Sequence, residues 1–305
     1  MPGFINPRKY LMKNILVVTG GAGFIGSNLI KELINFKKYK IISLDNYSSG
    51  SLKNHIKNKK VKYLKGETQN IESLLKVYKS NIHSIFHFGE FARIFQSFKK
   101  IKECFSSNIE GSTNVFNFAL KNKIRLIYSA TSASLGNDGK DMNLSPYAFS
   151  KAKNLELLEN LKRWFNLSYE VIYFYNVYGE RQICKGHMAT VVGIFEDHFK
   201  RGKKLPVVRP GTQVRRFTHV LDTVNACIFS WKKNKCKHYS IACKQSFSII
   251  ELAKLFKSPI KYLPERKGER FASALTKMNL NNKIVRLSAK IRLKDYVNNF
   301  LINNR

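Results

Sequence analysis

Leu16-Val17-Val18-Thr19-Gly20-Gly21-Ala22-Gly23-Phe24-Ile25-Gly26 is the stretch that decides the fold of this chain. The run from Ile15 to Val18 is short, apolar and β-branched, which indicates a buried parallel strand, and a helical pattern begins at Phe24. The three spaced glycines therefore lie in a tight turn between a strand and a helix. Glycine permits the turn conformation and lets the backbone approach a pyrophosphate, whose charge meets free N–H groups at the helix N-terminus. The stretch predicts a dinucleotide site.

An acidic residue supports this interpretation. The second predicted strand, Lys40 to Leu44, ends in Asp45, about 20 residues beyond the glycines, where a carboxylate accepts hydrogen bonds from the adenosine ribose. Its charge would repel a 2′-phosphate, so NAD is favoured over NADP. The alternative is that Asp45 merely caps a turn before Asn46. The expected cofactor-binding residues at this end are Gly20, Gly23, Phe24, Ile25, Gly26, Asp45 and Asn46.

Length and composition are those of a globular protein. With 305 residues, 44% of them apolar, the chain is long enough for one large α/β domain and a smaller partner. An uninterrupted apolar run of the roughly 20 residues that a membrane helix needs is missing, and the N-terminus lacks the apolar centre of a signal peptide, so a soluble cytoplasmic protein without membrane insertion is expected. The five cysteines are scattered without a C-x-x-C pair, which indicates neither a disulfide framework nor a metal site.

The formal net charge of +34 is the unusual number. It fits a nucleic-acid partner, an anionic membrane surface or a lysine-rich composition. The lysines are spread along the chain beside many Asn and Ile residues, without the arginine and aromatic interleaving of an RNA-binding face, which favours composition and makes a nucleic-acid partner unlikely. The alternative of another class is a nucleic-acid-binding or scaffold protein that has lost catalysis.

A tyrosine and a lysine form the predicted chemical centre. Ser145 suits an N-cap and Pro146 the first helical position, so Tyr147 and Lys151 share one face of a new helix, four residues apart. A lysine ammonium and the positive nicotinamide would favour the phenolate of Tyr147, which could then accept a proton from a sugar hydroxyl. Thr131, beyond the predicted strand Arg125 to Tyr128, would hydrogen-bond the same hydroxyl. The alternative for an isolated Y-x-x-x-K pair is two exposed residues without a chemical role.

At these residues the chain, from about Asn14 to its C-terminus, resembles the extended short-chain dehydrogenase/reductase family, in particular its NAD-dependent sugar-nucleotide epimerase/dehydratase group. Residues 19–26 match the family's cofactor turn, Asp45 its ribose-binding acid and Asn108 the asparagine of its long helix. The resemblance implies that Tyr147, Lys151 and Thr131 are catalytic. It also implies that Lys151 contacts the cofactor and that Glu67 lies near the adenine, where an aspartate is usual.

The second half resembles the family's substrate motifs. Residues 173–179 are similar to R-Y-F-N-V-Y-G, in which Asn176 would reach the nucleotide diphosphate, although Tyr173 replaces the arginine. Residues 213–222 resemble Q-x-R-D-F-x-H-V-x-D and place Arg215 on the diphosphate. Residues 266–269 resemble R-x-G-D/E and supply Arg266. Arginine suits a pyrophosphate because its fork donates to two oxygens. The alternative for these arginines is exposed, solvated charge.

Two further residues concern the sugar pocket. The family's H-x-A-A is here His87-Phe88-Gly89-Glu90, so Glu90 is expected either to bind sugar hydroxyls or an amino substituent, or to turn outward to solvent. Ser132, in a cluster of hydroxyls after a strand, is expected to meet the substrate.

The reaction is chosen by elimination within the resemblance. Dehydratases of this group follow the catalytic threonine with Asp and Glu, whereas Ser132 and Ala133 follow Thr131 here. The resemblance implies a 4-epimerase: Tyr147 removes the C4 hydroxyl proton, the C4 hydride passes to NAD, the 4-keto sugar turns over, and the hydride returns to the other face. An NDP-4-keto-sugar reductase, or another NDP-sugar oxidoreductase or dehydratase of the family, is the alternative.

The expected architecture is a Rossmann-type, doubly wound parallel sheet with a smaller, interleaved C-terminal substrate lobe. Residues 1–13 would be an N-terminal extension, residues 14–175 the NAD-binding domain, which also receives about 217–231, and residues 176–305 mainly the lobe. Relatives often dimerise through helices that correspond here to Ile101–Lys121 and Pro146–Phe165, so a homodimer is implied. Apolar residues on the second helix could equally belong to the core.

Overall fold

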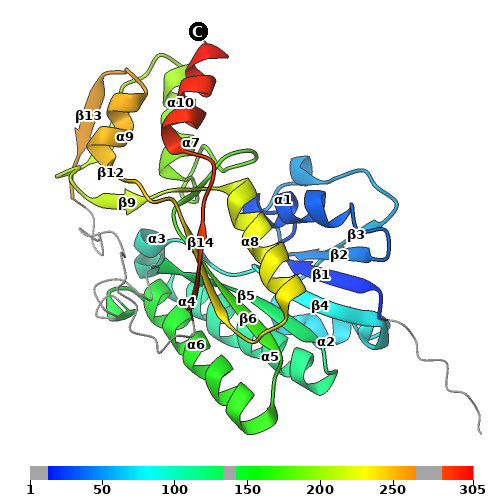
Figure 1. Cartoon of the computed structure of the whole chain (residues 1–305). Coiled ribbons are helices and arrows are strands. Elements are labelled where there is room, and N and C mark those ends of the chain that lie inside the picture. The colour runs from blue at the N-terminus through cyan, green and yellow to red at the C-terminus, as the bar shows by residue number, and fades with distance from the viewer. Residues whose placement is uncertain (1–12, 133–141, 266–283, 305) are drawn as a thin grey trace, which may run out of the picture.

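The computed structural model describes residues 13–132, 142–265 and 284–304. An eight-stranded sheet, in which every neighbouring pair is parallel, runs through the centre of the molecule (Figure 1). The expected Rossmann-type sheet is confirmed. In sheet order the strands are β14 (Ile284–Ser288), β11 (His238–Ala242), β6 (Tyr169–Phe174), β5 (Arg125–Thr131), β4 (Ile82–His87), β1 (Ile15–Thr19), β2 (Lys40–Asp45) and β3 (Val61–Lys65).

The strand order reverses at β1. This strand pairs with β2 on one side and with β4 on the other, and Thr19 lies in register with Leu44 and His87. All five residues of β1 are buried, as expected for a strand covered on both faces. Ligands of open α/β sheets bind outside the carboxyl ends of the strands at such a reversal. The glycine turn that follows β1 lies at this point.

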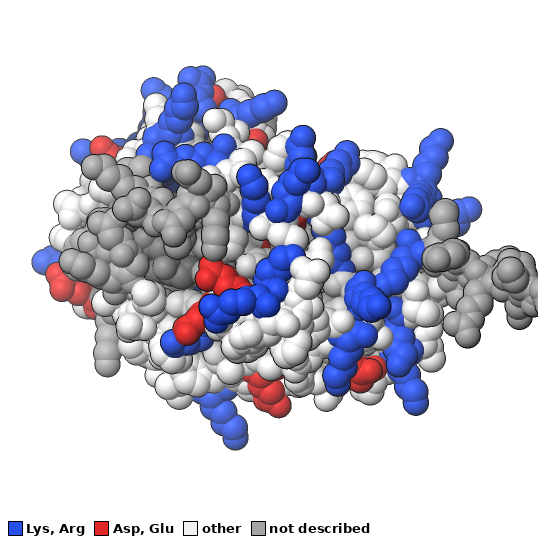
Figure 2. Space-filling model, turned by 60° about the horizontal axis from the view of Figure 1, so that its bottom comes forward, with Lys and Arg blue, Asp and Glu red and all other residues white. Residues whose placement is uncertain are grey.

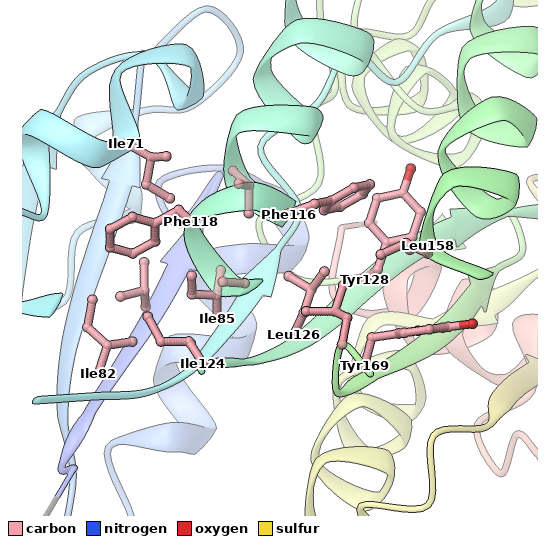
Figure 3. Close-up of a cluster of buried hydrophobic side chains, with 14 of the residues drawn as sticks. Ile71, Ile82, Ile85, Phe116, Phe118, Ile124, Leu126, Tyr128, Leu158 and Tyr169 are labelled. Atoms are coloured by element: carbon pink, nitrogen blue, oxygen red, sulfur yellow. The ribbon is translucent and has the colours of Figure 1, made fainter. Parts of the chain in front are cut away.

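Helices cover both faces of the sheet. On one face α1 (Phe24–Leu33) and α8 (Val220–Lys233) share a core with β1 and β4. On the other face α2 (Ile71–Leu74), α5 (Ser112–Lys121) and α6 (Pro146–Phe165) pack on a second core. Figure 3 shows this second core, in which the ring of Phe116 lies beside that of Tyr128. The carboxyl ends of β4 and β5 are therefore held between two packed layers.

The expected helix from Ile101 to Lys121 is not continuous. It consists of α4 (Ile101–Phe105), a π-helical turn (Ser106–Gly111) and α5. A preceding helix, α3 (Ile94–Lys99), was not predicted. The π-helical turn was missed because π-turns are rare and occur mostly as single turns inside α-helices, so a helical pattern in the sequence does not distinguish them.

The lobe has its own core and lies beyond the carboxyl ends of the sheet (Figure 1). Its helices are α7 (Val191–Lys200), α9 (Ile249–Leu255) and α10 (Leu293–Ile302). Three two-stranded sheets pair β8 (Leu205–Val208) with β13 (Ile260–Leu263), β9 (Val214–Arg216) with β12 (Ser246–Ser248), and β7 (Val177–Tyr178) with β10 (Thr218–His219).

Three later elements pack with the strands of the first half. α8 shares a core with β1 and β4, and β11 and β14 belong to the central sheet. The edge strand β14 is only partly buried and therefore lacks a clear apolar pattern. Within the described residues, the structure has no helix that is both long and apolar enough to cross a membrane.

Candidate active site

The glycine turn packs directly against the segment that follows β4. Gly20 has a φ of +69°, and a Cβ there would lie 2.9 Å from the backbone nitrogen of Gly89. A Cβ on Gly26 would lie 2.2 Å from the carbonyl oxygen of Gly20. Gly23 is the N-cap of α1 and provides no side-chain hydrogen bond, so the N–H groups of the first helical turn remain available to an anion. The turn fits a pyrophosphate.

Asp45 closes one side of this turn. Its Oδ2 accepts a hydrogen bond from the Ala22 backbone at 2.9 Å, and its Oδ1 accepts one from the Tyr47 backbone at 2.8 Å. Burial raises the pKa of the carboxyl group, and these backbone donors oppose that shift. Beside it Asn46 donates to Glu67 Oε2 at 2.9 Å. The carboxyl ends of β2 and β3 thus carry the polar groups that an adenosine ribose requires.

Tyr147 lies in the first turn of α6, the helix that carries the predicted catalytic pair. Ser145 is the N-cap of α6, with its Oγ accepting from the Ala148 backbone at 3.1 Å, and Pro146 takes the first helical position as predicted. The Tyr147 side chain is buried and hydrogen-bonds Thr131, the last residue of β5. Burial raises the pKa of Tyr147 to about 12, and the hydrogen bond to Thr131 opposes the increase. Tyrosine and threonine are therefore brought together as expected.

Lys151 lies one turn further along α6, buried, with its ammonium group inside the protein. It donates to the carboxylate of Glu90 and to the carbonyl oxygen of Ser129, and its Nζ lies 3.3 Å from the Tyr128 hydroxyl. Burial lowers the pKa of Lys151, and the negative charge of Glu90 opposes that decrease. The positive charge of Lys151 is thus compensated by the adjacent Glu90 side chain. The sequence did not indicate this ion pair.

Glu90 does not turn outward to solvent, so that alternative was wrong. Its side chain is only 2% exposed. Lys151 donates to Oε2 of Glu90. Three other groups donate to Oε1: the Ser112 hydroxyl at 2.9 Å, the Tyr128 hydroxyl at 3.0 Å and the Asn154 amide at 3.1 Å. These three partners were missed because they come from three separate elements, and each looks like an ordinary core or helix residue.

His87 extends this network back to the glycine turn. The hydroxyl of Thr19 accepts from the backbones of Phe88 and Gly89 and lies 2.7 Å from His87 Nδ1. The Thr19 proton therefore points to Nδ1, which leaves the ring proton on Nε2, 2.9 Å from the Ser112 hydroxyl. Complete burial lowers the pKa of His87 to about 4.

Asn108 uses the π-helical turn to tie three segments together. Its Oδ1 accepts from the Phe91 backbone at 2.6 Å, and its Nδ2 donates to the Phe91 carbonyl and to the Ser150 hydroxyl, both at 3.0 Å. Its own carbonyl accepts from Asn154 at 2.6 Å. π-Turns are frequent at functional sites because they re-aim one backbone carbonyl and side chain.

Arg93 is a further charged group that the sequence did not single out. Its Nε donates to the carbonyl oxygen of Met188 at 3.0 Å, which joins the segment after β4 to the loop before α7. Its positive charge lowers the pKa of Tyr147. Arg93 therefore links the large domain to the lobe beside the tyrosine.

The predicted substrate residues lie at the boundary with the lobe. Asn176 is exposed with a φ of +36°, and it donates to the Arg216 carbonyl at 2.8 Å. Arg215 lies in β9 and donates to the Val214 carbonyl at 2.9 Å. Ser132 is buried directly after Thr131. Arg266 lies outside the described residues. The structure thus joins Asn176 to β9, the strand that carries Arg215.

Comparison with known proteins decides the family. The NAD dependent epimerase/dehydratase family model matches residues 16–242, which include the glycine turn, Tyr147 and Lys151. The chain belongs to this family.

Its relatives in this family catalyse several reactions. The chain is 28% identical to ADP-L-glycero-D-manno-heptose-6-epimerase of Brachyspira hyodysenteriae over 81% of each chain. It is 27% identical to a putative UDP-glucose 4-epimerase of Methanocaldococcus jannaschii, over 82% of this chain and 84% of the relative. A crystal structure of UDP-glucose 4-epimerase from Thermotoga maritima, with UDP-glucose, matches with a TM-score of 0.83 and 27% identity, covering 94% and 97% of the two chains. UDP-glucuronic acid decarboxylases are similar as well.

NAD is the cofactor of this family, and the residues present fit it. The close packing at Gly20 and Gly26 leaves no room for side chains at the turn. Asp45 lies at the end of β2, where its negative charge favours a free 2′-hydroxyl over a phosphate. The chain is therefore an NAD-dependent nucleotide-sugar enzyme with a Rossmann-type fold.

Proposed function

We propose that the chain catalyses NAD-dependent epimerisation of a nucleotide-diphosphate sugar at C4, through a transient 4-keto intermediate. The observation that carries this proposal is the hydrogen-bonded pair of Tyr147 and Thr131 at the carboxyl end of β5, close to the glycine turn after β1. One hydroxyl group of a sugar can meet both side chains there.

Each residue of the pair has a distinct role. Thr131 holds the substrate hydroxyl, and Tyr147 accepts its proton and later returns it. NAD supplies a hydride acceptor that gives the hydride back. Because its pKa is about 12 without ligands, Tyr147 depends on nearby positive charge to act as a base. Arg93 and the positive nicotinamide ring supply charge of that sign.

The nucleotide diphosphate of the substrate would bind at the boundary between the large domain and the lobe. We propose that Asn176, Arg215 and Arg266 bind the diphosphate and that Ser132 contacts the sugar. Forked arginine donors match the oxygen atoms of a diphosphate. Glu90 was also expected to contact the substrate, but its burial beside Lys151 favours a different role, as counter-ion of that lysine.

Reaction at C4 is supported by the residue next to the catalytic threonine. Ser132 and Ala133 stand where dehydratases carry Asp and Glu, so the chain lacks the acid–base pair that would expel water. The relatives include epimerases that act on other sugars and a decarboxylase group, and a keto-sugar reductase would use the same residues. Substrate turnover distinguishes these activities.

The test begins with the purified protein. It is denatured and the released nucleotide is assayed, and intact protein is incubated with UDP-, GDP-, CDP-, dTDP- and ADP-sugars while NMR follows the products. Bound NAD together with a C4 epimer, without net redox change, is the expected result. Turnover that requires added NAD(P)H and a keto sugar would make the protein a reductase, and loss of carbon dioxide would make it a decarboxylase.

A cytoplasmic homodimer completes the proposal. The dimer would form through α4, α5 and α6, and Trp164 and Phe165 at the end of α6 are 57% and 60% exposed. Light scattering of the eluted protein during size-exclusion chromatography should give twice the 35.2 kDa chain mass. A monomeric mass would remove this part of the proposal without affecting the chemistry.

A further inference from the structure

The ammonium group of Lys151 already has three partners within the protein. They are the Glu90 carboxylate, the Ser129 carbonyl oxygen and the Tyr128 hydroxyl. An ammonium has three N–H donors, so this set can use all of them. The side chains of Lys151 and Glu90 are 4% and 2% exposed, which makes their ion pair a buried one.

The hydrogen-bond directions fit an ionised carboxylate at Glu90, because Oε1 accepts from three groups and Oε2 accepts from Lys151. Thr19 donates to His87, His87 donates to Ser112, and the Ser112 hydroxyl then donates to Glu90 Oε1 at 2.9 Å. The Asn154 amide can only donate, and it does so to the same oxygen at 3.1 Å. A chain of donors that ends on Glu90 requires an acceptor there, and a carboxylate accepts at both oxygens.

Because Lys151 is buried, its ammonium group needs a counter-ion inside the protein. An ammonium ion taken out of water loses its hydration and becomes a neutral amine unless a counter-ion and hydrogen bonds replace the water. Glu90 is the residue that replaces an alanine of the family motif in this sequence. The substitution therefore places a negative charge beside the lysine of the proposed catalytic pair.

We propose that Glu90 is a positioning residue for the reaction: its carboxylate is the internal counter-ion that keeps Lys151 an ammonium ion and fixes where that ion points. The inference rests on the proposed function only in that Lys151 belongs to the catalytic pair. Glu90 acts through Lys151 and does not touch the sugar.

Other titratable groups face Lys151 from the elements around it. His87 of β4 is neutral, Tyr128 of β5 is a phenol whose pKa is raised, and Cys104 of α4 is a thiol whose pKa burial raises to about 11. Tyr147, on the same helix, is also a phenol at neutral pH, and the charge of Arg93 acts on it. These four groups are uncharged at neutral pH, so Glu90 is the remaining acidic group beside Lys151.

The direct test reads the charge of Lys151 without any substrate. The Nζ resonance of Lys151 is followed by ¹H–¹⁵N NMR against pH in the purified protein and is assigned by its loss in Lys151→Met. In Glu90→Gln the ammonium should lose its proton at a pH lower by at least about one unit. Glu90→Asp, which keeps the charge, should titrate close to the wild type.

Glu103→Gln is the matched control, because Glu103 is an exposed carboxylate that pairs with Lys100 at 2.7 Å. It should leave the Lys151 titration unchanged. An unchanged titration in Glu90→Gln would overturn the proposal. If Glu90→Gln does not fold, the double variant Glu90→Gln/Lys151→Met should restore folding because it removes the uncompensated ion, and failure to restore it would assign Glu90 a structural role instead.

A second arm uses the proposed reaction. The alkaline limb of the kcat/KM profile should move to lower pH in Glu90→Gln and stay in place in Glu103→Gln. If the protein proves to have another activity, this arm fails while the NMR titration still decides the role of Glu90. The two proposals therefore fail in distinguishable ways.

Discussion

Tyr147 shows how far the properties of one side chain depend on its surroundings. A phenol with a pKa near 10 is a weak base at neutral pH, and in this protein burial raises that value to about 12. The charge of Lys151 is compensated by Glu90, while the charge of Arg93 lowers the pKa of Tyr147. The reactive form of the tyrosine therefore depends on ligands and on Arg93 more than the Y-x-x-x-K spacing alone indicates.

Tyr147→Phe should reduce kcat by about 10²- to 10⁴-fold, because it removes the group that transfers the proton. The amount of bound NAD and the melting temperature should change little, since only one oxygen atom is lost. Tyr262→Phe is the control, because Tyr262 lies in the lobe strand β13 with 47% of its surface exposed. A Tyr147→Phe variant with more than about a tenth of wild-type activity would contradict the assigned role.

His87 makes the fold sensitive to acid. Its pKa is about 4 in the folded state and about 6.5 when unfolded, so the unfolded state binds more protons between these values. The free energy of unfolding should therefore fall by about 3 kcal/mol through this group as the pH drops from 7 to 4. Urea unfolding at a series of pH values measures it.

The contribution of His87 to the loss of stability at low pH is isolated by comparing two variants with the wild type. His87→Gln should show a shallower decline with pH than the wild type, whatever its stability at pH 7. His187→Gln, at an exposed position, should follow the wild-type curve. Equal slopes in His87→Gln and the wild type would contradict the buried neutral imidazole.

At the scale of elements, α6 and the π-helical turn build the site together. α6 begins at Pro146 and presents Tyr147, Lys151 and Asn154 to the carboxyl ends of β4 and β5. The π-turn sets Asn108 against the segment after β4, so that Glu90 and Phe91 are held next to α6. Helix starts and helix irregularities thus decide where the chemistry occurs.

Ser145→Ala should destabilise the protein by about 1 kcal/mol, because it removes the N-cap of α6. It should also lower kcat, since Tyr147 lies two residues from the cap. Ser248→Ala is a matched control: Ser248 caps α9 in the lobe, with its Oγ 3.1 Å from the Glu251 nitrogen. Chemical denaturation and turnover are measured for both. Equal turnover in the two variants would contradict a role of the cap in placing Tyr147.

At the scale of the whole molecule, the chain carries a formal net charge of +34. Figure 2 shows Lys and Arg side chains over much of one face, with few acidic side chains among them. Such a field attracts anions in general and falls with ionic strength. A diphosphate-bearing substrate benefits from it as much as a nucleic acid would.

The protein should not bind RNA tightly at physiological salt. Fluorescence anisotropy with single-stranded and hairpin RNA should give weak binding at about 50 mM salt that largely disappears at about 200 mM, as expected for contacts with phosphates alone. Tight binding at physiological salt that survives Tyr147→Phe would favour the nucleic-acid-binding alternative over the enzyme. An unrelated polyanion such as heparin serves as the competitor control.

Much of the fold could be predicted because its signals are local. The buried run before Gly20 and the cap at Ser145 each use neighbouring residues, and the corresponding strand and helix begin where expected. The strands β11 and β14 and the π-turn escaped prediction. The two strands depend on long-range pairing, and a rare π-turn inside an α-helix is not distinguished by a helical pattern in the sequence.

By itself the sequence determined the strand–turn–helix around the glycines, the parallel sheet and the helical spacing of the proposed catalytic pair, because backbone sterics and hydrophobic period act over a few positions. Only the tertiary structure decided that Lys151 is buried against Glu90 and that Thr19, His87 and Ser112 lead to the same carboxylate. The physical reason is that burial and charge compensation depend on which elements meet in space, and these residues come from β1, β4, α5 and α6 and from the segment after β4.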